Sequence, residues 1–246
     1  MSHKAKPSIS IIIAVFNGAD TLSLCLNSIK MQNMINKEVI VMDAGSNDGT
    51  QEILKLHSDT IDYWESKPDR GIAHAWNKAL LIAKGDWILF LGADDQLFDE
   101  NVLIDFSRHF EANQTEDLIY GKIIFNNGKL DGKILGEEFF WSVYKRRMSF
   151  PHTSCFQKRE LFERIGMFDE TFKIAVDYEI FLRCQNLRAK FIDRFVTKMG
   201  GEGLSSKKTV LSLTESRRAQ IKNHVNDRWK IELWYFIYRL RHALNN

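Results

Sequence analysis

The sequence predicts an α/β protein with a doubly wound, mostly parallel sheet, helices on both sheet faces and a C-terminal helical extension. Its 246 residues, 44% hydrophobic and 27% charged, suit one α/β domain with an added segment. The first hundred residues alternate between apolar, β-branched runs and segments with helical spacing. Short connections join them, which is typical of a parallel sheet with right-handed crossovers.

The first half of the chain carries the clearest pattern. Residues 8–16 are almost continuously apolar, as in a strand buried on both faces. Helical spacing follows, with apolar side chains three or four residues apart. In such a sheet, ligands bind outside the carboxyl ends of the strands. We expect strands at 8–16, 38–42, 61–64 and 87–91, and helices at 19–32, 49–57 and 71–83.

The pattern is less regular after Asp95. Asn127-Gly128 indicates a hairpin turn, and the glycines of 200–203 indicate a flexible loop. We divide the chain into a domain of residues 1–204 and a basic amphipathic helical tail of residues 205–246. We expect strands at 118–125, 129–135, 153–157 and 189–196, and helices at 159–165, 178–186, 209–224 and 227–244.

Charge is unevenly distributed along the chain. The net charge of +2 is too small for a nucleic-acid-binding protein that relies on its overall field. The tail has nine Lys and Arg against three Asp and Glu, so it carries +6 and the first 204 residues carry −4. A basic tail on an acidic body suggests that one end meets an anionic surface.

Cysteine usage and hydropathy point to the cytoplasm. Cys25, Cys155 and Cys184 are widely spaced and form no CxxC pair, so we expect buried free thiols in a reducing compartment. The apolar run at 9–16 meets Asn17 and Gly18 without a cleavage pattern, which argues against a signal peptide. No other apolar run approaches the roughly 20 residues that cross a bilayer.

Acidic residues follow two of the predicted strands. Asp43 and Asp48 come after the second strand, and Asp94-Asp95 come after the fourth. Adjacent carboxylates repel each other, and a hard divalent cation removes the repulsion. The alternatives are structural: Asp48 caps the next helix, and Asp94-Asp95 form a turn or a cap.

The usual phosphate-binding loops are missing. There is no G-x-G-x-x-G after the first strand and no G-x-x-x-x-G-K-[ST] in the chain. A sheet that binds a nucleotide without a glycine-rich loop needs another positive charge for the phosphates. A metal ion held by carboxylates supplies it, as in metal-dependent sugar-nucleotide chemistry.

Several short motifs follow one another in order over about the first 205 residues. They are Ile11 to Asn17, Asp43-Ala44-Gly45-Ser46-x-Asp48-Gly49-Thr50, Lys67 to Ile72, Asn77-Lys78-Ala79, Gly85-Asp86, Leu91-x-Ala93-Asp94-Asp95, Gly166-x-Phe168-Asp169-Glu170 and Asp177-Tyr178-Glu179-x-Phe181-Leu182-Arg183. Together they resemble family 2 of the inverting glycosyltransferases, which have the GT-A fold. Any one motif is weakly specific, whereas the ordered set is specific. The sequence departs from the family at Ala73-His74, where an aromatic and an acidic residue are common, and at Gly92-Ala93.

The resemblance implies a role for each matching position. Asp95 would bind Mn²⁺ or Mg²⁺, Asp94 would reach the ribose or a metal-bound water, and Asp177 would be the general base. Asp43 would accept the imide N–H of the base. The remaining substrate-binding positions are the backbone at Ala14, Val15 and Phe16, beside the nucleobase, and the loop Asp69, Arg70 and Gly71, near the nucleoside and diphosphate.

Other side chains admit a functional and a structural interpretation. His152 is a candidate acceptor or leaving-group contact, and Trp141 and Tyr144 are candidate stacking residues in an acceptor site. Trp76 is expected in the core. Asp169-Glu170 is expected in a turn and cap.

The function expected from these features is transfer of a sugar from a nucleoside-diphosphate donor, a UDP-sugar, to a hydroxyl of a glycan or lipid-linked acceptor. Two alternatives remain open. A sugar-nucleotide pyrophosphorylase would need a glycine- and arginine-containing loop after the first strand, and Phe16 to Ala19 is not one. A non-catalytic sugar-nucleotide-binding subunit of a polysaccharide assembly complex would bind the donor without releasing UDP.

The tail combines basic residues with an apolar helical stripe. Trp229, Leu233, Phe236, Ile237, Leu240 and Leu244 recur at steps of three or four. Packing on the catalytic domain is one explanation. The basic residues and tryptophans favour the other, peripheral attachment to an anionic membrane surface on its cytoplasmic side.

Overall fold

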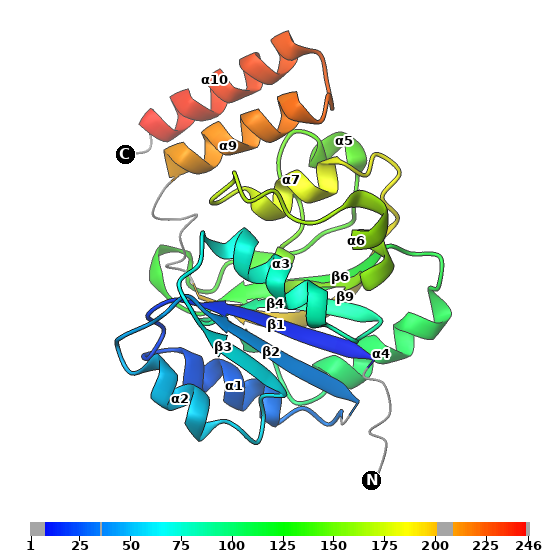
Figure 1. Cartoon of the computed structure of the whole chain (residues 1–246). Coiled ribbons are helices and arrows are strands. Elements are labelled where there is room, and N and C mark those ends of the chain that lie inside the picture. Colours follow the sequence, from blue (N-terminus) through cyan, green and yellow to red (C-terminus); the bar gives the residue numbers. More distant parts are fainter. Residues whose placement is uncertain (1–7, 35, 201–208, 245–246) are drawn as a thin grey trace.

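The computed structural model describes residues 8–34, 36–200 and 209–244. One mixed sheet runs through it in the strand order β3-β2-β1-β4-β8-β6-β9-β5, with β7 paired to β6. Helices cover both faces, and two C-terminal helices form an outer layer on one side (Figure 1). The α/β class with helices on both faces is therefore confirmed.

The parallel half of the sheet has a strand order that reverses at β1. Strands β1 (Ile9–Val15), β2 (Lys37–Asp43), β3 (Tyr63–Ser66) and β4 (Trp87–Gly92) are parallel, and β1 pairs with both β2 and β4. The intervening helices are α1 (Leu22–Lys30), α2 (Thr50–Leu56) and α3 (Ile72–Ile82). In sheets of this kind, a ligand crevice is expected where the order reverses, at the carboxyl ends of the strands.

The second half of the sheet is mixed rather than mostly parallel. Strand β8 (Cys155–Lys158) runs antiparallel to both β4 and β6 (Leu118–Phe125), whereas β9 (Ala189–Met199) is parallel to β6. The short strands β5 (Gln96–Leu97) and β7 (Ile134–Leu135) add antiparallel edges. These pairings join segments far apart in the sequence, so no local pattern predicts their direction.

Two apolar cores lie on the two sheet faces. On one face, Ile11 and Ile13 of β1 pack with α1 and with α4 (Val102–Ala112). On the other, Ile12 packs with α3, α6 (Arg159–Ile165) and α7 (Val176–Leu182). Successive side chains of β1 thus serve opposite cores, which explains its continuous apolar run.

Helix α4 and some short elements were not predicted. Leu103, Phe106 and Phe110 of α4 have helical spacing and are buried, so the signal was present in the sequence. The hairpin after β6 also differs, because a 3₁₀ turn at Gly128–Leu130 precedes β7. A short helix, α5 (Trp141–Tyr144), and a 3₁₀ turn at His152–Ser154 follow.

The C-terminal tail begins with a docked helix. Helix α9 (Thr209–Lys222) packs against α7, and α10 (Arg228–Leu244) lies along α9 (Figure 1). Ala219 of α9 and Ile231 of α10 are fully buried. The predicted domain boundary after residue 204 and the predicted loop at 201–203 lie outside the described residues, and the two-part division stays a prediction.

Burial agrees with the expectation for the thiols. Cys25, Cys155 and Cys184 are free and buried. Within the described ranges, no helix is both long and apolar enough to span a bilayer.

Candidate functional site

Acidic loops begin on both sides of the end of β1. Val15 pairs with Asp43 of β2, and Ala14 pairs with Gly92 of β4, two residues before Asp94. Neighbouring strands are only about 5 Å apart, so the sheet brings the Asp43 loop and the Asp94 loop to one edge. The sequence predicted this juxtaposition from the strand ends.

Asp43 is buried and held by hydroxyl and backbone donors. Its Oδ2 accepts the Ser46 N–H at 3.0 Å and the Ser66 hydroxyl at 2.5 Å. Its Oδ1 accepts the Ser46 hydroxyl. Three of the roughly four lone-pair positions of the carboxylate are therefore occupied, and one is left for a further donor.

Asp95 is the most deeply buried carboxylate of the β4 loop, with 2% of its surface exposed. Its oxygens accept the N–H of Gly92 at 2.9 Å and of Gly200 at 3.2 Å. Burial, and next the charge of Asp94, raise the pKa of Asp95 to about 7. A Cβ at residue 200 would overlap the Asp94 carboxylate, so glycine is required there for close approach.

The two carboxylates of Asp94 and Asp95 are donors of the kind that a hard divalent cation prefers. Within residues 8–34, 36–200 and 209–244, no Lys or Arg forms an ion pair with either carboxylate. The same ranges contain no group of three or more acidic, His or Cys side chains suited to a metal ion. A cation held there would therefore need oxygen ligands in addition to these two side chains.

The loop Asp69-Arg70-Gly71 is joined to the segment before α7. The Asp69 carboxylate accepts the Gly71 N–H at 2.7 Å, and the Arg70 guanidinium pairs with Glu170 at 2.5 Å. The Lys173 ammonium donates to the Arg70 carbonyl at 2.5 Å. In this structure, Arg70 therefore connects two loops.

Asp177 is the second residue of α7. Its Oδ1 accepts the Tyr178 N–H at 2.8 Å, and burial raises the pKa of this carboxyl to about 6. Burial and then the charge of Asp177 raise the pKa of both Tyr144 and Cys155. The N-cap residue of α7 is Ala175, so Asp177 lies in the first turn of the helix and is not its cap.

His152 lies in an aromatic core. It is 6% exposed, its Nε2 lies 3.0 Å from Gln157 Nε2, and its ring stacks on Phe90. Burial lowers the pKa of His152 to about 3, so the ring is neutral at ordinary pH. The expected contact with an acceptor or leaving group stays a prediction, and this placement weighs against it.

The remaining aromatic candidates are mostly structural. Trp76 is buried as expected and contacts the His152 and Phe90 rings. Tyr144 is fully buried, and its hydroxyl has no hydrogen-bond partner among the described residues. Trp141 packs at the margin of the same core.

The end of β1 offers an exposed ring. Ala14 is half-buried and Val15 is buried, whereas Phe16 is 65% exposed. Asp48 accepts the N–H of Ala19 and of Thr50, the first residue of α2, whereas the N-cap position that the structural interpretation gave to Asp48 is occupied by Gly49. These bonds hold the loops after β1 and β2 together.

Sequence reasoning missed several residues that shape the site. Ser66 ends β3 beside Asp43, and its position at a strand end was the available signal. Gly200 follows β9, and the only signal for it in the sequence was the glycine next to it. Glu215, which binds the segment before α7, had no clear signal, because it is simply one of the few acidic residues in a basic tail.

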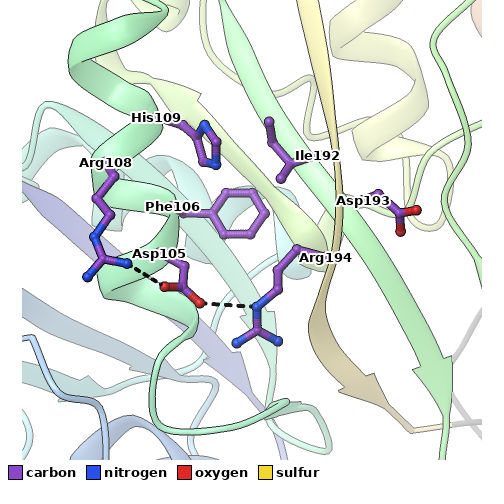
Figure 2. Close-up of a pocket in the computed structure, with 7 residues that line it drawn as sticks. All are labelled: Asp105, Phe106, Arg108, His109, Ile192, Asp193 and Arg194. Carbon is purple, nitrogen blue, oxygen red and sulfur yellow. Dashed lines mark hydrogen bonds and ion pairs between the residues drawn. The ribbon is translucent and has the colours of Figure 1, made fainter.

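A separate surface pocket lies between α4 and β9 (Figure 2). Asp105 in this pocket pairs with Arg108 at 3.0 Å and with Arg194 at 3.2 Å. None of the predicted site residues lines it. Its charges are already compensated within the chain.

The family model for glycosyl transferase family 2 matches residues 10–176. The chain belongs to glycosyl transferase family 2. It is 30% identical over 191 residues to a PGL/p-HBAD biosynthesis glycosyltransferase of Mycobacterium bovis, covering 73% of this chain and 70% of that relative. The matched region includes both acidic loops and ends one residue before Asp177.

Solved structures share the fold of this family 2 glycosyltransferase. S. aureus TarS 1-349 in complex with UDP-GlcNAc has a TM-score of 0.71 at 19% identity, covering 96% of this chain and 72% of that one. The chain spans 43% of the longer TarS structure. The mannosyltransferase PcManGT from Pyrobaculum calidifontis, in complex with GDP-Man and Mn²⁺, has a TM-score of 0.64 at 19% identity, covering 97% and 76%.

The raised pKa of Asp177 predicts its effect on stability. The folded-state pKa of about 6 lies above the ordinary 3.8, so ionisation disfavours the fold. The contribution of the protonated group is fully present below pH 3.8 and is lost as pH rises through 6. At pH 8, Asp177→Asn should therefore raise the melting temperature, with a gain of at most about 3 kcal/mol.

Thermal unfolding at pH 4.5 and pH 8 measures this effect. The gain of Asp177→Asn over wild type should be larger at pH 8. An Asp177→Asn variant that melts at a lower temperature than wild type at pH 8 would contradict the raised pKa of Asp177.

Proposed function

We propose that this family 2 glycosyltransferase transfers a sugar from a UDP-sugar to a hydroxyl of a glycan or lipid-linked acceptor, with inversion at the anomeric carbon. The observation that carries the proposal is the placement of Asp43 and of the Asp94-Asp95 pair at the ends of the two strands beside β1, together with the raised pKa values of Asp95 and Asp177. One-step displacement by a hydroxyl inverts the reacting carbon and needs a base for the hydroxyl proton.

Asp177 is suited to be that base. A carboxyl with a pKa of about 6 is mostly ionised at neutral pH and binds a proton more strongly than an ordinary aspartate. As the acceptor oxygen attacks the anomeric carbon, its proton moves to the Asp177 carboxylate. The bond between the anomeric carbon and the diphosphate oxygen breaks, and UDP leaves with that electron pair.

Asp95, assisted by Asp94, would hold Mn²⁺ or Mg²⁺. Burial, and next repulsion from Asp94, raise the pKa of Asp95, and a bound cation would offset both effects, which supports this assignment. A bound cation would supply charge stabilisation for the leaving diphosphate. Asp95 has the buried, backbone-fixed carboxylate, so it is the principal protein ligand in the proposal.

Asp43 would select the nucleobase of the donor. Its one remaining acceptor position suits a single N–H, and uracil offers one at N3. The exposed ring of Phe16, at the end of β1, offers a flat apolar surface to the base. The Asp69–Gly71 loop would border the nucleoside and diphosphate. The Lys67 N–H, just before this loop, donates to the Asp43 carbonyl at 2.9 Å, which supports the proposal.

Helix α10 would attach the enzyme to the cytoplasmic face of an anionic membrane. Trp229 and Phe236 are each 64% exposed although α9 is docked, so much of the stripe stays uncovered in this chain. Basic residues near such a surface contribute about 1 kcal/mol each. The basic residues of the helix are Arg228, Lys230, Arg239 and Arg241.

The first prediction concerns Asp177 as the general base. Asp177→Asn should lower kcat by about 10²–10⁴-fold with little change in donor affinity, because it removes proton transfer but not binding. In wild type, kcat/KM should fall about tenfold per pH unit below pH 6, as Asp177 becomes protonated. UDP release measures both, with Asp59→Asn at an exposed ion pair as the control.

A near-wild-type kcat in Asp177→Asn would refute the base assignment. UDP binding without UDP release by wild type, across a panel of glycan and lipid-linked acceptors, would favour the non-catalytic binding subunit.

The second prediction concerns the nucleobase of the donor and the metal ion together. UDP should raise the melting temperature more than GDP or ADP, and Mn²⁺ should enlarge the UDP effect, since a ligand that binds only the folded state stabilises it. dTDP is the nearest competitor, because thymine shares the N3–H edge. Asp95→Asn should lose the Mn²⁺-dependent part. A melting-temperature shift with GDP equal to that with UDP would overturn the uracil assignment at Asp43. No effect of Mn²⁺ on the UDP shift would overturn the metal assignment at Asp95.

The third prediction concerns the membrane. The protein should co-sediment with phosphatidylserine-containing vesicles but not with phosphatidylcholine vesicles, and high salt should weaken the binding. Trp229→Ser with Phe236→Ser should reduce binding several-fold. Leu81→Ser, at an even more exposed apolar position on α3, is the control. Equal binding to both vesicle types, or none to either, would return α10 to a packing role.

A further inference from the structure

The C-terminal helix α9 provides a buried carboxylate to the segment that precedes α7. Glu215 is 6% exposed, and its oxygens accept three consecutive backbone N–H groups. The distances are 2.9 Å and 3.0 Å to Lys173, 2.8 Å to Ile174 and 3.0 Å to Ala175. Ala175 is the N-cap residue of α7, two positions before Asp177.

The same segment is connected to the loop before α3. The backbone N–H of Lys173 donates to the Glu215 carboxylate, and its side-chain ammonium donates to the Arg70 carbonyl. Its side chain passes over Gly71, where a Cβ would lie 3.4 Å from the ammonium nitrogen. Glu215 therefore fixes a segment that contacts the predicted donor loop on one side and carries Asp177 on the other.

A second side chain of α9 holds the residue after Asp177. The Gln220 amide donates to the Tyr178 hydroxyl at 2.9 Å and to the carbonyls of Lys145 and Arg146. Asp177 thus lies between a backbone position that Glu215 restrains and a side chain, Tyr178, that Gln220 restrains. The bonds to the Glu215 carboxylate are charge-assisted, and such bonds are roughly twice as strong as neutral ones.

We propose that Glu215 is a positioning residue for Asp177, so that the C-terminal tail completes the catalytic site. The inference rests on the proposed function of Asp177. It concerns a part of the chain beyond residues 10–176, which the family model matches. Removing the carboxylate leaves three N–H groups without their acceptor and lets the start of α7 shift. A shift of about 1 Å at a catalytic group can cost about 10²-fold in rate.

The test compares Glu215→Ala and Glu215→Gln with wild type in UDP release, well below each melting temperature. Glu215→Ala should lower kcat by about 10–100-fold with the donor KM within about twofold. Glu215→Gln keeps one acceptor oxygen for Ile174 and Ala175, so its kcat should lie between those of wild type and Glu215→Ala. It also supplies a folded variant if Glu215→Ala is too unstable.

Glu38→Ala is the matched control. Glu38 is likewise buried, and its carboxylate accepts the consecutive N–H groups of Lys84 and Gly85 at the opposite, amino-terminal edge of the sheet. Glu38→Ala should lower the melting temperature but leave kcat within about twofold. A purely structural role of Glu215 would make the two alanine variants behave alike.

A double mutant separates the inference from the proposed function. In an Asp177→Asn background, Glu215→Ala should cause no further loss of kcat, because the group it positions is gone. An additive loss, or wild-type kcat in Glu215→Ala while Asp177→Asn is impaired, would overturn the inference alone. Wild-type kcat in Asp177→Asn would instead overturn the proposed function.

Discussion

Strand β1 has a parallel neighbour on each side, and this arrangement determines where the acidic loops of the crevice lie. Because Asp43 ends β2 and Asp94-Asp95 follow β4, the sheet concentrates negative charge at one edge. The chain neutralises the two sides differently. Asp43 is surrounded by hydroxyl and N–H donors, whereas Asp95 has two N–H donors and an acidic neighbour. That difference is the reason for which we propose nucleobase recognition at Asp43 and a cation at Asp95.

The first half of the fold was predictable because its signals are local. Apolar runs, helical spacing and acidic residues at strand ends predict β1 to β4 and the edge where Asp43 and Asp95 meet. Helix α4 had the same kind of signal, in Leu103, Phe106 and Phe110, and was overlooked. The antiparallel course of β8 was beyond local reasoning, since its partners belong to β4 and β6.

The site residues divide in the same way. Asp177 follows an apolar stretch in a recognisable motif, but its raised pKa depends on burial by elements remote in sequence. His152 shows the opposite outcome, because aromatic residues from several elements enclose a ring that the sequence left open to either role. Glu215 and Gly200 act through contacts that span 40 to 105 residues, which residue type alone does not reveal.

The bond from Gly200 to Asp95 also fixes the order in which the crevice can assemble during synthesis. The parallel half, through β4, is complete in sequence long before residue 200 is made, and chains fold from the N-terminus as they emerge. Until Gly200 arrives, the Asp95 carboxylate lacks one of its two N–H donors and remains accessible to water, which solvates its charge. Asp95 reaches its final burial only when the end of β9 lies against it, so a chain that stalls before residue 200 would keep this carboxylate hydrated.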